Sequence, residues 1–96
     1  MKVAIWNEQE IARTNQWKEL ENNIYFPSEE VNTKYLEPSD KKTVCPWKGE
    51  ASYFHIKVNE DTNNDAAWTY RDPKESAKEI QGYIAFWKGV TIKEKA

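Results

Sequence analysis

The only cysteine and the only histidine of the chain, Cys45 and His55, lie ten residues apart, with Lys48 between them in the segment CPWKG (45–49). A nearby cation lowers the pKa of a thiol, and an imidazole can act as its base. These three side chains could therefore form an activated nucleophile. A lone cysteine is more often a small buried side chain that only packs, so packing is the first interpretation of Cys45 and a reactive thiol is the alternative.

Two metal-dependent chemistries find little support in the sequence. A structural zinc site takes about four Cys or His ligands, and the chain has one of each. Nucleotidyl transfer needs paired carboxylates for Mg²⁺ and a phosphate cradle. Asp61 and Asp65 are the one close acidic pair at a suitable spacing, and they lie in a polar stretch (60–65) predicted as a hairpin loop. The three glycines form no phosphate loop. We expect no metal and no cofactor, and whether the chain is an enzyme stays open.

The clearest secondary-structure signal is the alternation of side chains in segment 51–59, which predicts a β-strand with Phe54, Ile56 and Val58 on one face. The segment AAWTY (66–70) predicts the strand that pairs with it. Cross-strand pairing would then place an aromatic wall beside a polar one. The side chains involved are Trp68 and Tyr70 on the second strand, and Tyr53, His55 and Lys57 on the first.

The remaining segments predict short elements. They are an opening hairpin over 2–14, a loop or helical turn over 15–23, a strand at 24–26 ended by Pro27, a helical turn at 28–31, a turn at 38–40, an α-helix from Pro73 to Gly82, and a closing hairpin of 83–87 with 90–94. The predicted fold is mainly β: one domain over residues 1–96, a small antiparallel barrel or sandwich of about six to eight strands with one short covering α-helix near the C-terminus.

Composition narrows the class of protein. Aromatic residues make up 14% of the chain, which favours a packed globule even though 31% of residues are charged. The net charge of -2 is evenly spread, so the chain has no basic face for nucleic acid. No segment approaches the roughly 20 apolar residues of a membrane span. One cysteine cannot form an intrachain disulfide, which suits a reducing compartment, so we expect a cytoplasmic protein.

Five stretches together have the order and spacing of a known family: YFP (25–27), LEPSD (36–40), T-x-CPWKG-x-A (43–51), AAWTY (66–70) and I-x-GYIAF (80–86). By these stretches the chain resembles the bacterial domain of unknown function 427 family, whose members are sometimes labelled nucleotidyltransferases. The resemblance implies a compact, mostly antiparallel β fold with one short helix. It implies no settled reaction and no catalytic residue.

Several side chains could converge on a pocket around the CPWKG turn and the AAWTY strand. Such a pocket has stacking faces and cationic donors, which suit a small anionic or aromatic ligand. The candidate residues are Ser39, Thr43, Cys45, Lys48, Tyr53, His55, Trp68 and Tyr70, with Arg71 as a further candidate. A small-molecule binding module is thus the leading hypothesis. The alternatives are an enzyme, nucleotidyltransferase-like or thiol-dependent through Cys45, and an interaction module or homo-oligomer that uses exposed Trp and Tyr.

Overall fold

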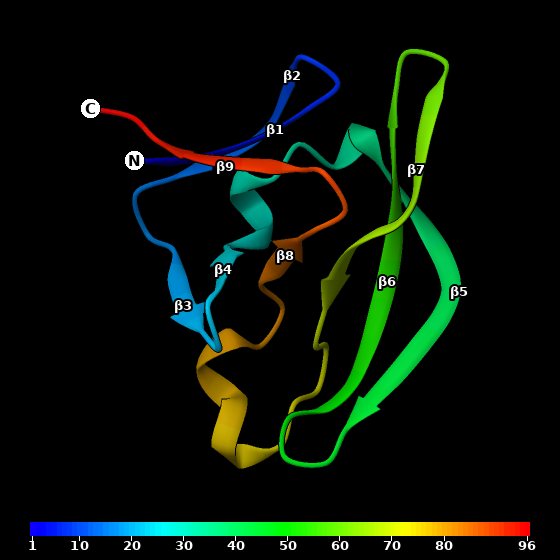
Figure 1. Ribbon diagram of the computed structural model, residues 1–96. Helices are drawn as coiled ribbons and strands as arrows, with labels where there is room; N and C mark the ends of the chain where they lie inside the picture. Colours follow the sequence, from blue (N-terminus) through cyan, green and yellow to red (C-terminus); the bar gives the residue numbers. More distant parts are fainter.

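The computed structural model describes residues 1–96 as nine antiparallel strands and three short 3₁₀ turns (Figure 1). The strands are β1 (Lys2–Trp6), β2 (Gln9–Thr14), β3 (Lys18–Leu20), β4 (Asn23–Phe26), β5 (Leu36–Cys45), β6 (Gly49–Val58), β7 (Asp61–Thr69), β8 (Ile84–Phe86) and β9 (Thr91–Glu94). The 3₁₀ turns are η1 (Ser28–Glu30), η2 (Thr33–Tyr35) and η3 (Glu75–Ile80).

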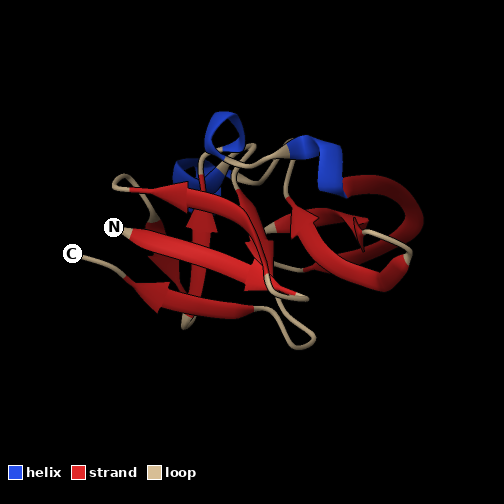
Figure 2. Ribbon diagram, turned by 90° about the horizontal axis from the view of Figure 1, so that it is seen from above, coloured by secondary structure: helices blue, strands red, loops and turns tan.

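The strands form two sheets, and neither closes into a barrel. The smaller sheet has the order β2-β1-β9, and the larger has the order β3-β4-β8-β7-β6-β5. The first and last strands of the chain are neighbours in the smaller sheet, where Lys2 pairs with Glu94, so the two termini lie side by side (Figure 2). The prediction of a mainly β, antiparallel fold is confirmed, although the strand count exceeds the six to eight expected.

The central strands of the larger sheet are buried on both faces by two separate apolar clusters. On the face toward the smaller sheet, which we call the inner face, Phe26 and Phe86 pack edge to face with their ring centroids 5.5 Å apart. Ile11 of the smaller sheet belongs to the same cluster. On the opposite, outer face, Tyr25 packs with Ile80 of η3 in a second cluster. Successive residues of a strand point to opposite faces, so each central strand contributes to both clusters.

Short hairpin turns connect several strands, and they contain backbone conformations that non-glycine residues seldom adopt. Asn7 and Glu8 between β1 and β2 have φ angles of 54° and 62°, and Glu21 and Asn22 between β3 and β4 have 52° and 67°. Positive φ at both central residues is the mark of a type I′ turn, whose twist matches that of the flanking strands. The segment 15–23 was expected to be a loop or helical turn. Its residues 18–23 instead belong to the β3–β4 hairpin.

The predicted α-helix from Pro73 to Gly82 is wrong. The segment instead forms η3, a 3₁₀ element of six residues with a non-helical backbone at Ala77 (φ −128°, ψ 21°). So short a segment gains few intrahelical hydrogen bonds, and packing decides its geometry. Ala77 and Ile80 are still buried together against the sheet, as their spacing of three residues predicts.

Three other local predictions also fail. The closing hairpin does not exist, because β8 pairs with β4 and β7 in the larger sheet while β9 pairs with β1 in the smaller one. The loop predicted over 60–65 is a two-residue turn, Asn59–Glu60, and β7 begins at Asp61. The turn predicted at 38–40 is a bulge inside β5, where Ser39 Oγ accepts a hydrogen bond from the Lys41 amide.

The β1–β2 turn generates a stability prediction. Glu8→Gly should raise the free energy of unfolding by roughly 0.5–1 kcal/mol, because glycine removes the cost of left-handed backbone and this exceeds its entropic cost. Glu60→Gly is the matched control, since in that turn only Asn59 has positive φ; it should lower stability by a similar amount. Urea denaturation of both variants measures the difference. Equal destabilisation by both would contradict the assignment of the Glu8 conformation.

Candidate functional site

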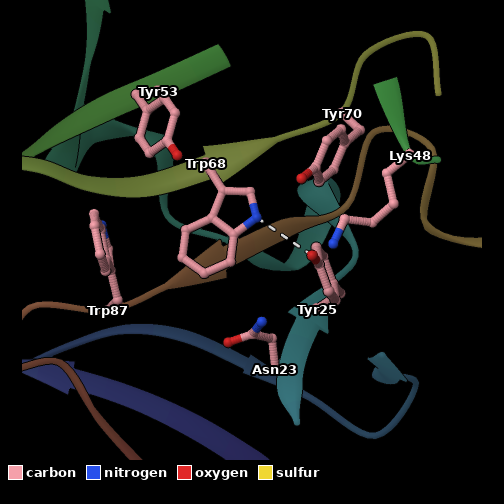
Figure 3. Close-up of a pocket in the computed structure, with 7 residues that line it drawn as sticks. All are labelled: Asn23, Tyr25, Lys48, Tyr53, Trp68, Tyr70 and Trp87. Carbon is pink, nitrogen blue, oxygen red and sulfur yellow. Dashed lines mark hydrogen bonds between the residues drawn. The ribbon is translucent and has the colours of Figure 1, made fainter. Parts of the chain in front are cut away.

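The outer face of the larger sheet contains a cavity of about 150 Å³. Its lining is mostly aromatic, with three tyrosines and two tryptophans, and a lysine lies at one end (Figure 3). The residues that line it are Asn23, Tyr25, Lys48, Tyr53, Trp68, Tyr70 and Trp87.

Strand register explains how two of the aromatic lining residues, Trp68 and Tyr25, come together. Trp68 of β7 and Tyr25 of β4 both lie opposite Ala85 of the short strand β8 between them. Since Ala85 is fully buried and carries only a methyl group, the two large side chains meet across it. Their rings are edge to face with centroids 6.2 Å apart, and Trp68 Nε1 donates a 3.3 Å hydrogen bond to the Tyr25 hydroxyl (Figure 3).

Trp68 is also the centre of the aromatic wall. Tyr53 is its direct cross-strand partner on β6, with ring centroids 6.5 Å apart. The ring of Trp87 stands edge to face against Trp68 at 6.0 Å. Trp87 is held in place because its Nε1 donates to the Asp65 carbonyl at 2.6 Å. The Trp68 indole is therefore packed against three rings, those of Tyr25, Tyr53 and Trp87.

The turn that carries Lys48 is fixed by the segment leading into η3. The Lys74 amide donates to the Lys48 carbonyl at 2.8 Å, and the Lys74 ammonium donates to the Pro46 carbonyl at 2.6 Å. Ser76 Oγ donates to the Trp47 carbonyl at 2.5 Å. Gly49, with φ of 112°, then returns the chain to β6. All three carbonyls of the turn are bound, so the turn presents the Lys48 side chain in one direction.

Lys48 is buried although it carries a charge. The residue is 7% exposed, and Figure 3 shows its ammonium directed toward Tyr25 inside the cavity. A hydrogen-bonded ion pair with the half-exposed Glu21 compensates the charge. Burial alone would lower the pKa of Lys48, but the hydrogen bond to Glu21 and the charge of that carboxylate oppose it, and the pKa is raised. The Lys48 ammonium therefore stays charged at neutral pH.

The two tyrosines beside Lys48 are neutral donors. Burial raises the pKa of Tyr25 and of Tyr70, and the Lys48 charge only partly offsets it. The Lys48 ammonium lies 5.7 Å from the centre of the Tyr70 ring. A charged donor and two phenol hydroxyls thus face the same small space, which is an arrangement that an acceptor group can satisfy.

Comparisons with known proteins place this chain in a family. Residues 2–95 match a family model named NTP_transf_9, which is described as a domain of unknown function (DUF427). The chain belongs to the DUF427 family. The resemblance seen in the sequence motifs is thereby confirmed. A comparison with curated proteins found no match.

Four of the five stretches that carry the family resemblance meet at the cavity. Residues 25–27 supply Tyr25, residues 43–51 supply Lys48, and residues 66–70 supply Trp68 and Tyr70. Residues 80–86 supply Ala85, the alanine that lets the Tyr25 and Trp68 rings meet. Motifs far apart in the DUF427 sequence therefore build one site.

Cys45 is near this site but does not line it. It ends β5, is half-buried, and packs against the outer-face cluster. Burial raises the pKa of the thiol, yet the backbone amides of Trp47 and Lys48 and the Lys48 charge together lower it below its ordinary value. The Cys45 thiol therefore loses its proton more readily than an ordinary thiol does.

Three predicted residues lie away from the cavity. Thr43 Oγ1 is 3.0 Å from the Tyr53 hydroxyl and braces that ring. Ser39 Oγ donates to the Asp65 carboxylate at 2.5 Å, and this bond lowers the Asp65 pKa. His55 Nδ1 accepts a 3.0 Å hydrogen bond from the Asp65 amide. A serine bonded to the carboxylate, with no hydrogen bond to the imidazole, does not have the geometry of a catalytic triad.

The sequence interpretation missed three lining residues and the counter-ion. Asn23, Tyr25 and Trp87 reach the cavity only because β4, β8 and β7 are neighbours in the sheet, and no local pattern reveals that order. Glu21 stands in a segment expected to be a loop. The run IYF did identify the strand that carries Tyr25, but not the face on which its ring would lie.

Neither metal-dependent interpretation acquires ligands in the folded chain. No three His, Cys, Asp or Glu side chains gather closely enough to hold a metal ion. Asp61 accepts a hydrogen bond from Asn7 at 2.9 Å, whereas Asp65 is bound by Ser39. The two acids thus bond to different partners. The structure also contains no helix with the length and apolarity needed to cross a membrane.

The electrostatics around Cys45 generate a prediction with two opposite arms. The pH midpoint for alkylation of Cys45 by iodoacetamide should lie below about 8.5, which is the value for a free thiol. Lys48→Met removes a charge that stabilises the thiolate and should raise the midpoint. Glu21→Gln removes a charge that opposes it and should lower the midpoint. Rates measured in the folded protein as a function of pH give all three values.

An unchanged midpoint in both variants would contradict this account of the thiol. Lys93→Met is the matched control, because Lys93 is an exposed lysine on β9, and it should leave the midpoint where it is. A thiol that reacts only after denaturant is added would show that Cys45 does nothing but pack.

Proposed function

We propose that this protein is a binding module whose ligand is a small anionic or aromatic molecule, bound in the cavity between Lys48 and Trp68. The observation that carries the proposal is a lysine that is 7% exposed, charged, and directed into a cavity walled by aromatic rings. Burying an ammonium costs free energy. Placing it in a cavity is explained by an anionic or hydrogen-bond-accepting group that it binds.

The size and lining of the cavity restrict the ligand. A volume of about 150 Å³ accommodates a single six-membered ring, and it lies below the roughly 300–1,000 Å³ of most ligand sites. A ring would pack against Trp68 and Tyr53, while its substituent meets Lys48 and the tyrosine hydroxyls. Anything larger than one ring would extend out of the cavity toward solvent.

A thiol-dependent enzyme is the second candidate, and the lowered pKa of Cys45 favours it. A nucleotidyltransferase, which the name of the family model suggests, has less support because no carboxylate lines the cavity. For either function we expect the cytoplasm as the location, since a lone thiol stays reduced there.

Binding of benzoate tests the proposal. Benzoate should perturb the indole N–H resonances of Trp68 and Trp87 in NMR spectra, with millimolar affinity. Lys48→Met keeps the side-chain stem and removes the charge, and it should weaken binding by about ten- to a hundredfold, as expected for the loss of a charged hydrogen bond. Lys93→Met should bind as the unaltered chain does.

A variant with the opposite expected effect on benzoate affinity provides a second test. Glu21→Gln removes the carboxylate that occupies the Lys48 ammonium and should tighten benzoate binding. The proposal fails if benzoate leaves both indole resonances unmoved, or if Lys48→Met binds it as well as the unaltered chain does. Wild-type-like amide spectra of the variants are required, because a variant that simply unfolds would show that Lys48 is part of the core.

A further inference from the structure

A second cavity, of about 460 Å³, opens on the inner side of the larger sheet. Its apolar walls include Leu36, Phe54 and Ile84, and Arg71 stands at its edge. Three hydroxyl side chains, Ser28 of η1, Thr33 of η2 and Thr69 of β7, complete the polar part of the lining. The Thr69 hydroxyl already donates a 2.7 Å hydrogen bond to the Tyr83 carbonyl. The cavity thus combines an apolar interior with one cation and two hydroxyls, of Ser28 and Thr33, that make no hydrogen bond within the chain.

This cavity is separate from the one around Lys48. Phe54 comes directly after Tyr53, and Ile84 comes directly before Ala85. Tyr53 and Ala85 both belong to the outer face. Consecutive residues of a strand point to opposite faces. The two cavities share no lining residue, so occupation of one can be measured independently of the other.

The cation at the edge of the second cavity is held in position but has no charged partner. The guanidinium of Arg71 lies 5.6 Å from the centre of the Phe54 ring, and the Arg71 carbonyl accepts a 3.2 Å hydrogen bond from Gln81. No hydrogen bond or ion pair within the chain uses the guanidinium. The neighbouring acid, Asp72, pairs with Lys78 at 3.4 Å. Arg71 therefore presents a free set of planar donors, stacked on an aromatic ring, to whatever enters the cavity.

We propose that this second cavity is a binding site for a monocarboxylate with an apolar body, such as an aryl or alkyl acid. The guanidinium fork matches the two oxygens of a carboxylate, and the hydroxyls of Ser28 and Thr33 can supply further hydrogen bonds. The walls formed by Leu36, Phe54 and Ile84 take the apolar body. The volume of this cavity falls within the range of known small-molecule sites. One cation with apolar walls suits a monoanion better than a phosphate, which carries more charge.

Phenylacetate and its neutral analogue phenylacetamide form the matched probes for this site. In ¹⁵N NMR titrations of the whole chain, phenylacetate should perturb the amides of Thr33 and Phe54 and the side-chain N–H of Arg71. Phenylacetamide should bind about tenfold more weakly or worse, because it lacks the charge that the guanidinium recognises. Arg71→Gln should weaken phenylacetate to the level of the amide, and Arg71→Lys should lie between the two.

Three results would overturn the proposal: equal binding of the acid and the amide, unchanged binding by Arg71→Gln, or perturbation confined to Trp68, Trp87 and the Lys48 turn. Lys48→Met serves as the crossed control, since it should leave the Thr33 and Phe54 perturbations intact. The comparison of the two probes on the unaltered chain decides the question even if a substitution at Arg71 disturbs folding. Failure here would leave the benzoate test of the outer cavity unaffected.

Discussion

A strand of three residues holds the larger sheet together. β8 has all three of its side chains buried, and it pairs with β4 on one side and β7 on the other. Without it, the β3–β4 hairpin would have no hydrogen-bonded connection to the β5–β6–β7 meander. Its central residue, Ala85, separates Tyr25 from Trp68, and its neighbours Ile84 and Phe86 enter the inner core. The position of one short strand thus determines both the continuity of the sheet and the geometry of the outer cavity.

The charge distribution follows from the same arrangement. Bringing β3 and β4 to the sheet places Glu21, in the turn between them, against Lys48 in the turn between β5 and β6. Breaking a buried ion pair by removing one partner is costly because the other charge is left uncompensated. Here the Glu21 carboxylate is half-exposed and the Lys48 ammonium is buried. Water can therefore solvate Glu21 once it is released, whereas Lys48 needs another anion in its place. The pair is therefore asymmetric, and the exposed partner is the one that a ligand can displace.

Local pattern predicted the parts of the structure that local pattern determines. The alternation in residues 51–59 identified β6, and it paired Tyr53 with the strand that carries Trp68. The polar residues 61–65 gave no such signal, because this part of β7 is stabilised by its ladder with β6 rather than by apolar burial. The candidate site was predictable to the same extent. Lys48, Tyr53, Trp68 and Tyr70 line the cavity. Ser39 lies in the bulge of β5, and His55 lies where the register between β6 and β7 shifts, so both bond to Asp65 instead; alternation predicts neither irregularity. Tyr25 and Trp87 depend on strand order, which connects distant segments.

The pairing of β1 with β9 has a consequence for how the chain is made. β1 can form its hairpin with β2 as soon as both have left the ribosome, since a two-residue turn joins them. Its other edge finds a partner only when β9 has been synthesised, because Lys2 pairs with Glu94. Contacts between such distant segments carry the largest loop-closure entropy and slow folding. Until β9 emerges, β1 has an open strand edge of the kind that other chains can join. Pairing with β9 covers that edge of β1, and β9 becomes the edge strand of the folded sheet.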